Sequence, residues 1–343
     1  MMDGICFRAA DARSGAGRLP IAGLHPAGAP VPGPLPEGSC WEIMTGAVLP
    51  PDCDTIVRYE DVRCEDGHAH LDPAEAIPGR HLHAAGSDFR AGDELVPGGT
   101  RLGSREIAVA ATVGATEVRV AAIPRITIIT TGDELVPSGE IPAAHQVRQS
   151  NNHSLQAALA VWGSTEPVML HVPDDEAAHT AAFETALRTS DLVLACGGIS
   201  RGKRDLVRPV LEKLLGAPEF RGIAQRPGKP LAYWKGPPPV FALPGNPMSV
   251  LVCFHRYVLP ALAAMSGTPW QRRRVALTSR FEFKPPFAYF LPVVLDENHR
   301  AGPTPTANSG DFATAITSDG FIELPADQDE FPPGTSVAYQ PWL

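Results

Sequence analysis

The chain has 343 residues, of which 44% are hydrophobic and 20% are charged, and its formal net charge is −9. A chain of this length is too long to fold around one ordinary hydrophobic core, so we expect two or three domains. The acidic balance argues against nucleic acid as the main partner, and no apolar run approaches the ~20 residues that span a bilayer. The start of the chain has no secretion signal, and the six cysteines form no CxxC pair. We therefore expect a cytoplasmic protein without a structural zinc site.

The N-terminal part of the chain alternates short apolar runs with Pro/Gly turns. Residues 14–88 follow this pattern and predict a small β domain. Residues 1–13 and 89–123 are assigned to a linker or dimerisation region. Within it, residues 104–113 could form a helix with Ser104 as its N-cap, followed by a strand at 116–122.

Residues 124–267 alternate strands and helices in the way that is typical of an α/β domain with a mainly parallel sheet. Strands are predicted at 125–130, 191–196 and 240–243, and helices at 150–162, at 175–188 and from Val250 onward. Residues 268–343 return to strands, at 274–283, 288–297, 320–325 and 335–341, and predict a separate, barrel-like C-terminal β domain. The predicted fold class is therefore α/β plus all-β modules.

Three polar, glycine-bearing loops follow the predicted strands of the α/β domain. They read Thr131-Gly132-Asp133-Glu134, Gly197-Gly198-Ile199-Ser200 and Pro244-Gly245-Asn246-Pro247. The third is stiff, because Pro presets φ and Gly tolerates a positive φ, and it opens a helix whose N-terminus favours anions. One such loop alone would be an ordinary connection. Because ligands bind at the carboxyl ends of parallel strands, all three together predict a binding site at one edge.

Carboxylates and cations accompany these loops. Glu134 has nothing obvious to cap, whereas Asp174 and Asp205 stand near helix starts, where capping is an alternative explanation. Together these carboxylates could hold Mg²⁺, which prefers oxygen ligands and often bridges phosphates. Arg226 and Lys229 bracket a Pro-Gly turn and could clamp a phosphate, although ordinary solvated charge is the commoner role of such residues. Further cations flank the second loop, at Arg201, Lys203 and Arg204.

Other nucleotide and hydrolase motifs are missing from the sequence. No GxGxxG, GxSxG or Walker A pattern occurs, so a Rossmann dinucleotide site is not expected. Cys196 stands beside the second loop, but a cysteine that ends an apolar strand is usually just buried.

The motifs together resemble those of the molybdopterin molybdenumtransferases, the MoeA proteins and the related gephyrin E domain. The resemblance follows the motifs in order along nearly the whole chain. The matching segments are MDG (2–4), IAG (21–23), IMTGAVLP (43–50), AAGSDFRAGDEL (84–95), GTRL (99–102), TGDEL (131–135), SNNHSL (150–155), PDD (173–175), CGGISRGKRD (196–205), RPGKP (226–230) and LPGNPMS (243–249). The family usually has a further, partly helical segment before MDG, whereas this chain begins at that motif.

The resemblance implies a MogA/MoaB-like central domain and a homodimer whose active site is shared between subunits. It implies insertion of molybdate into adenylylated molybdopterin, with Mg²⁺-dependent release of AMP, and contacts with molybdopterin adenylyltransferase or molybdoenzymes. The implied catalytic residues are Asp3, Glu134, Asp174 and Asp205, of which the last three would bind the metal. The implied substrate-binding residues are Thr45, Thr131, Gly132, Asp133, Gly197, Gly198, Ser200, Arg226, Lys229, Pro244, Gly245, Asn246, Pro247 and Ser249. Asp3 and Thr45 would serve the site of the other subunit.

Two alternatives stay open. A non-catalytic molybdopterin-binding paralogue or scaffold would fit the short N-terminus and the residues Ile5, Cys6 and Cys196, which depart from the family pattern. An adenylyltransferase would share the α/β domain and a GGIS-like loop, but the two β modules and the LPGNP loop argue against it. The sequence does not distinguish molybdate from tungstate.

Overall fold

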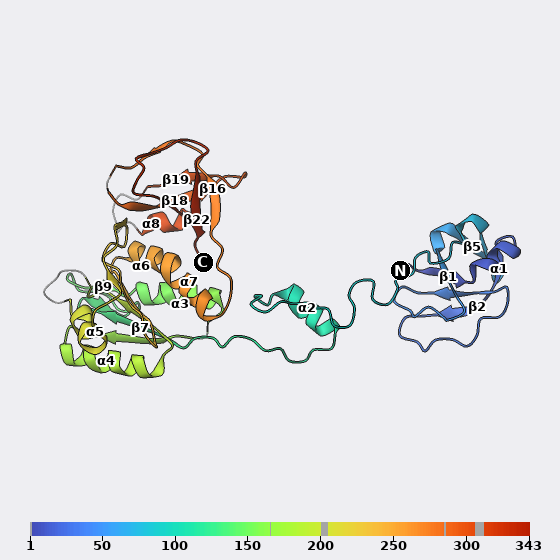
Figure 1. Cartoon of the computed structure of the whole chain (residues 1–343), viewed down its shortest axis with the longest axis horizontal. Coiled ribbons are helices and arrows are strands. Elements are labelled where there is room, and N and C mark those ends of the chain that lie inside the picture. Colours follow the sequence, from blue (N-terminus) through green and yellow to red (C-terminus); the bar gives the residue numbers. More distant parts are fainter. Residues whose placement is uncertain (1, 165, 200–204, 285, 306–311) are drawn as a thin grey trace. The chain divides into compact units, whose positions relative to one another are not determined.

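The computed structural model describes residues 2–164, 166–199, 205–284, 286–305 and 312–343 (Figure 1). Its internal contacts divide the chain into two compact units, Met1–Leu95 and Val96–Leu343. Each unit is described by itself below.

The first unit is built on a six-stranded sheet in the order β4-β1-β3-β2-β6-β5. Its strands are β1 (Gly4–Phe7), β2 (Arg18–His25), β3 (Cys40–Ile43), β4 (Thr55–Arg58), β5 (Val62–Glu65) and β6 (His68–Leu71), accompanied by α1 (Ala9–Ser14), η1 (Tyr59–Asp61) and η2 (Pro73–Glu75). The sequence assigned residues 1–13 to a linker region, but β1 is fully buried and pairs with both β3 and β4. Four consecutive buried residues explain this central place. The other domain boundaries stay predictions.

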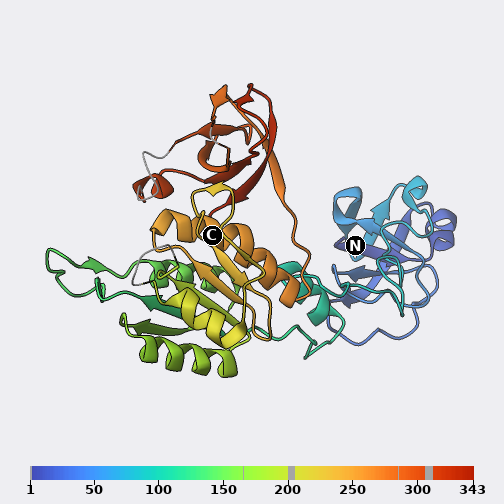
Figure 2. The same cartoon turned by 60° about the vertical axis from the view of Figure 1, so that its left-hand side comes forward.

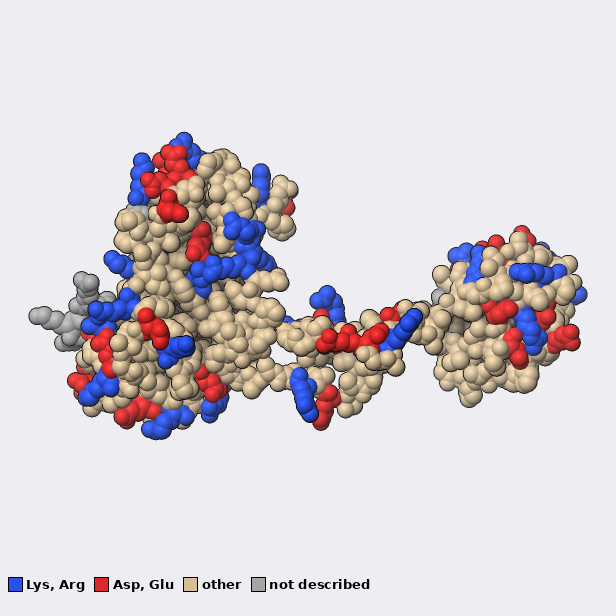
Figure 3. Space-filling model, viewed as in Figure 1, with Lys and Arg blue, Asp and Glu red and all other residues tan. Residues whose placement is uncertain are grey.

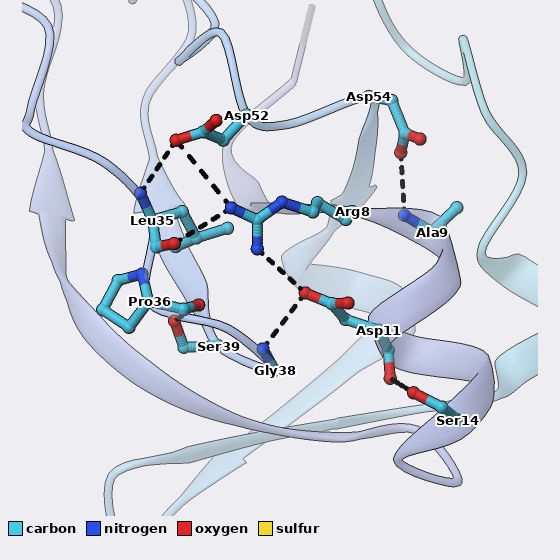
Figure 4. A network of polar contacts seen from close by, with 10 residues as sticks. All are labelled: Arg8, Ala9, Asp11, Ser14, Leu35, Pro36, Gly38, Ser39, Asp52 and Asp54. Atoms are coloured by element: carbon cyan, nitrogen blue, oxygen red, sulfur yellow. Dashed lines mark hydrogen bonds and ion pairs between the residues drawn. The ribbon is translucent and has the colours of Figure 1, made fainter.

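A polar network ties the β2–β3 connection to α1 (Figure 4). Arg8 donates from Nη1 to Asp11 Oδ2 (3.2 Å) and from Nη2 to the Leu35 carbonyl (3.0 Å). Asp52 Oδ2 accepts from the Leu35 N–H (3.1 Å), and Asp54 Oδ1 accepts from the Ala9 N–H (2.8 Å) at the start of α1. The network satisfies backbone groups of the β2–β3 connection and of the first turn of α1, which have no partner within a sheet or helix ladder.

The second unit contains a mainly parallel sheet in the order β10-β7-β11-β15-β14-β12. The parallel strands are β7 (Ile126–Thr131), β10 (Val168–Val172), β11 (Leu192–Cys196) and β15 (Val240–Leu243), and the antiparallel ones are β12 (Phe220–Arg221) and β14 (Ala232–Trp234). Every residue of β7, β11 and β15 is buried, as expected for strands covered on both faces. The predicted strands and the predicted α/β fold are confirmed.

Helices cover both faces of this sheet (Figures 1 and 2). On one face lie α3 (Asn151–Trp162) and a continuous helix, Pro247–Met265, made of α6 (Pro247–Cys253), η3 (Phe254–Val258) and α7 (Leu259–Met265). On the other lie α4 (Glu176–Thr189) and α5 (Val207–Leu215). The predicted helices at 150–162 and 175–188 are confirmed. The helix Pro247–Met265 is long and apolar enough to cross a membrane, but 61% of the 18-residue apolar window within it is buried in the protein, as in a core helix.

The segment before the sheet differs from the prediction in two details. Helix α2 (Ser104–Thr112) has Gly103 rather than Ser104 as its N-cap, and Glu106 Oε2 accepts from the Gly103 N–H (2.9 Å). The strand expected at 116–122 is wrong, because these residues are exposed and pair with no strand among the described residues. Alternating valines alone do not make a strand where no neighbouring edge is available. A short parallel pair, β8 (Leu135–Val136) and β9 (Val147–Arg148), follows β7.

The C-terminal strands form a sheet in the order β13-β18-β20-β22-β16, with β19 beside β18. Its members are β13 (Gln225–Arg226), β16 (Arg273–Ala276), β18 (Ala288–Leu295), β19 (Ala301–Pro303), β20 (Gly320–Leu324) and β22 (Ser336–Pro341), with the small pair β17 (Phe281–Glu282) and β21 (Glu330–Phe331) and the helix α8 (Ala313–Ile316) nearby. The C-terminal β domain is confirmed. It is not wholly separate, because its edge strand β13 comes from the α/β segment.

The last residues dock on the core helix through His255. Its Nδ1 donates to the Leu251 carbonyl (2.8 Å), which leaves Nε2 free to accept from the Leu343 N–H (3.0 Å). The Trp342 ring stands edge-on to His255, with 5.3 Å between ring centroids. Burial of the imidazole lowers the pKa of His255 to about 4.

We expect His255 to make the chain less stable in mild acid. Below the ordinary histidine pKa of about 6.5 the unfolded chain binds a proton that the buried imidazole does not take up until about pH 4. The contribution of His255 is therefore complete above pH 6.5 and is lost as the pH falls towards 4, by up to about 1.4 kcal/mol per pH unit. Urea unfolding across this range should show a shallower decline for His255→Gln than for the wild type. An equal pH dependence of the unfolding free energy in the two proteins would contradict the lowered pKa of His255.

Candidate functional site

The α/β sheet changes winding direction between β7 and β11. From β7 the chain passes through α3 to β10 on one side, and from β11 it passes through α5 towards the strands on the other side. At such a switch point the loops at the carboxyl ends of the strands separate and leave a crevice. Thr131 ends β7, and Gly197 follows β11 directly.

The three loops meet at this crevice. Gly197 and Gly198 have φ of +96° and +63°, and a Cβ on either would lie 3.1 Å from Thr131 Oγ1. A Cβ on Gly245 would lie 3.8 Å from Gly197 Cα. Glycine permits both the positive φ and the close approach of the backbones. The prediction that the loops after β7, β11 and β15 gather at one edge is confirmed.

A cavity of about 1050 Å³ opens where the loops meet. Its lining includes twelve of the residues that the sequence singled out, namely Thr131, Glu134, Gly197, Gly198, Asp205, Arg226, Lys229, Pro244, Gly245, Asn246, Pro247 and Ser249. Gly132, Asp133 and Asp174 are not part of the lining. The Asp174 N–H donates to Asp133 Oδ1 (3.1 Å), so Asp174 lies against the β7 loop. Ser200, Arg201, Lys203 and Arg204 lie outside the described residues.

Among the described residues, the acidic residues that line the cavity are Glu134 and Asp205. Within the described ranges no group of three His, Cys, Asp or Glu side chains could hold a metal ion by itself. Two carboxylates nevertheless fit Mg²⁺, which commonly binds one or two protein carboxylates together with substrate phosphates and water. A role for Asp174 in metal binding stays a prediction.

Positive charge on the cavity wall comes from Arg148, Arg226 and Lys229. Over the part of the chain that the structure describes, no carboxylate forms an ion pair with Arg226 or Lys229, and both side chains are exposed. Positive and negative side chains both occur across this unit on the face shown in Figure 3. Anion binding by this acidic chain therefore depends on local cations.

The Arg226–Lys229 loop is held by a buried glutamine. Gln225 donates from Nε2 to the Pro227 carbonyl (3.0 Å), and its Oε1 accepts from the Tyr257 hydroxyl of the core helix. Gly228 has φ of +92° and lies against Cys253, so the loop passes close to the core helix. These contacts fix the backbone between the two cations before any ligand binds.

The lining also contains residues that were not predicted as site residues, among them Arg148, Asn151 and Phe287. Arg148 lies two residues before the SNNHSL motif, and Asn151 is its second residue. Asn151 Nδ2 donates to the Gly245 carbonyl (2.7 Å). The position of that motif after the β7 loop was the signal that could have identified them. Phe287 comes from the C-terminal β domain, and no local pattern in the sequence places it at the cavity.

The pKa values of Cys196 and Asp3 are shifted, the first by burial and the second by a hydrogen bond. Cys196 is buried at the end of β11, and burial raises the pKa of its thiol to about 12. The thiol therefore stays protonated, and the prediction that it is simply buried is confirmed. In the first unit Asp3 Oδ1 accepts from the Thr45 N–H (2.6 Å), and this bond lowers the pKa of Asp3 below its ordinary value.

Comparison with known proteins matches the whole length of the chain to one family. Family models match in three places: the MoeA N-terminal region (domain I and II) over residues 1–114, a probable molybdopterin binding domain over 127–264, and the MoeA C-terminal region (domain IV) over 274–342.

Individual relatives agree with these models. The chain is 35% identical over 350 residues to the molybdopterin molybdenumtransferase of a Synechocystis species, covering 100% of this chain and 87% of that protein. It is 30% identical to the enzyme of the same name from Haemophilus influenzae, covering 99% and 86%. A crystal structure of the molybdopterin biosynthesis MoeA protein from Pyrococcus horikoshii superimposes with a TM-score of 0.79 at 31% identity, over 99% of this chain and 86% of that one.

Proposed function

We propose, because the chain belongs to the molybdopterin molybdenumtransferase (MoeA) family of molybdenum cofactor biosynthesis, that its cavity binds adenylylated molybdopterin and molybdate. One observation carries this proposal. The same cavity, at the switch point of the sheet, presents Arg226 and Lys229 together with Glu134 and Asp205. Cations suit the phosphates of an adenylylated substrate, and carboxylates suit the divalent cation that accompanies them.

The residues divide the work by charge. Arg226 and Lys229 would hold phosphate oxygens by charge-assisted hydrogen bonds, and the N-terminus of the core helix at Pro247 would add favourable partial charge. Glu134 and Asp205 would hold Mg²⁺, which when bound neutralises phosphate charge and polarises the phosphoryl group. The glycines at 197, 198 and 245 let the backbone approach the ligand closely.

Turnover tests this proposal directly. The purified chain is incubated with adenylylated molybdopterin, molybdate and Mg²⁺, and we expect AMP release to accompany retention of molybdenum on the pterin. The control omits Mg²⁺ and should release little AMP. Absence of AMP release with all three components present would overturn the proposal, and would favour a binding protein if the pterin still bound.

We also propose a homodimer in which Asp3 and Thr45 of each copy complete the site of the other. In support, the first unit presents an ionised Asp3 hydrogen-bonded to Thr45 on its surface, while the second unit carries the cavity. The mass of the active chain in solution tests this, and an active monomer would contradict it. The six free cysteines favour the reducing cytoplasm as its compartment; recovery from an oxidising compartment in cell fractionation would contradict that assignment.

A further inference from the structure

The cationic loop of the cavity is fastened to the C-terminal β domain. Strand β13 pairs with β18 in parallel, with Gln225 opposite Ala288 and Arg226 opposite Tyr289. The Ala288 N–H donates to the Ala224 carbonyl (2.9 Å) just before this pair. The start of β18 is therefore held beside the loop that carries Arg226 and Lys229.

Each of the two cations lies over an aromatic ring of this strand or of the residue before it. Arg226 Cζ is 5.6 Å from the ring centroid of Tyr289, and Lys229 Nζ is 5.2 Å from that of Phe287. Phe287 is half-buried and lines the cavity. Tyr289 is buried, and the ring of Phe283 packs against it with 4.4 Å between centroids. Both distances lie within the range of cation–π attraction.

An aromatic partner differs from a carboxylate in a way that matters for anion binding. A carboxylate would hold a cation in place but would also cancel its charge and compete with the ligand. A ring attracts the cation through its quadrupole and leaves the full positive charge available. Lys and Arg side chains are also flexible, so a ring that restricts them in the free protein lowers the entropy lost when an anion binds.

We propose that Phe287 and Tyr289 are positioning residues, which hold Lys229 and Arg226 in place for a phosphate-bearing ligand without neutralising them. This inference rests on the proposed function, and it gives the C-terminal β domain a part in the same site. It predicts that the ring of Phe287, rather than its volume or its burial, supports anion binding.

The test compares binding of AMP, measured by calorimetry at low salt, and steady-state turnover. Phe287→Leu keeps an apolar side chain but removes the ring, and should weaken AMP binding about threefold to fivefold. The KM for adenylylated molybdopterin should rise by a similar factor while kcat stays close to that of the wild type. Phe287→Tyr keeps an aromatic ring and should keep both the AMP affinity and the KM close to those of the wild type. Val294→Ala, a change of an exposed residue on β18, serves as the control for general effects on the sheet.

A double-mutant cycle separates positioning from packing. In a Lys229→Ala background, Phe287→Leu should have almost no further effect on AMP binding, because the ring then has no ammonium group to hold. Additive effects of the two changes, or wild-type affinity in Phe287→Leu, would overturn the inference while leaving the proposed function intact. A wild-type chain that neither binds AMP nor releases it would overturn both.

Discussion

Replacing Glu134 by glutamine is expected to lower the rate of AMP release on the order of 100-fold or more. Glu134 lines the cavity at the carboxyl end of β7, and its side chain is exposed. The amide keeps the size of the side chain but removes the negative charge that would hold Mg²⁺, a cation that prefers charged oxygen ligands. Because an exposed side chain adds little to folding, the free energy of unfolding should change by no more than about 0.5 kcal/mol.

A nearby glutamate provides the matched control for this change. Glu140 is exposed and does not line the cavity. Its backbone N–H donates to the Pro137 carbonyl (3.0 Å), and its backbone carbonyl accepts from Arg148 Nε (2.9 Å). Glu140→Gln should keep full turnover. Steady-state AMP release measured over a range of Mg²⁺ concentrations should also show that Glu134→Gln needs more Mg²⁺ for half-maximal rate. Unchanged turnover in Glu134→Gln would show that this carboxylate is not part of the reaction.

Replacing Gly228 by alanine is expected to weaken AMP binding more than tenfold and to destabilise the second unit. At Gly228 φ is +92°, and a Cβ would lie 2.5 Å from Cys253 Sγ and 2.6 Å from Gln225 Nε2. The positive φ alone costs an L-residue roughly 1–2 kcal/mol. The steric overlap adds to this and pushes Gln225 off the contacts that hold the loop. Calorimetric AMP binding and urea unfolding measure the two effects.

A second glycine near the same loop separates the effect of backbone strain at a positive φ from that of steric overlap of an added Cβ. Gly222 also has a positive φ, +69°, but the nearest atom to a Cβ there is the Lys229 carbonyl oxygen at 3.7 Å. Gly222→Ala should therefore lose only the roughly 1–2 kcal/mol of backbone strain and keep AMP affinity. Equal losses of affinity in the two variants would show that the fit of Gly228 against Cys253 does not matter for the site.

Local patterns in the sequence predict much of the α/β domain. Apolar runs bounded by turns predict β7, β11 and β15 to within a residue or two at each end, because buried parallel strands leave a strong local signal. The rule that ligands bind at strand carboxyl ends then places the three glycine loops at one crevice without knowledge of any contact. The family resemblance adds the identity of the ligand, which no pattern of residues shows.

Long-range pairing limits what the sequence can predict. Strand β13 has only two residues, so no periodicity reveals that Arg226 pairs beside Tyr289 in another domain. For the same reason Phe287 could not be assigned to the cavity. Asp174 follows a strand of the same sheet, but β10 lies at its edge, one strand away from the crevice. Whether a strand-end residue reaches the site depends on strand order, which the local sequence does not contain.

The most direct test of the site is a crystal structure of the chain with AMP or adenylylated molybdopterin bound. We predict the phosphate group at about 3 Å from Lys229 Nζ and the Arg226 guanidinium, in the cavity at the ends of β7, β11 and β15. With Mg²⁺ present, the ion should lie between that phosphate and the carboxylates of Glu134 and Asp205. A ligand bound outside this cavity, with Arg226 and Lys229 facing solvent, would contradict the assignment of the site.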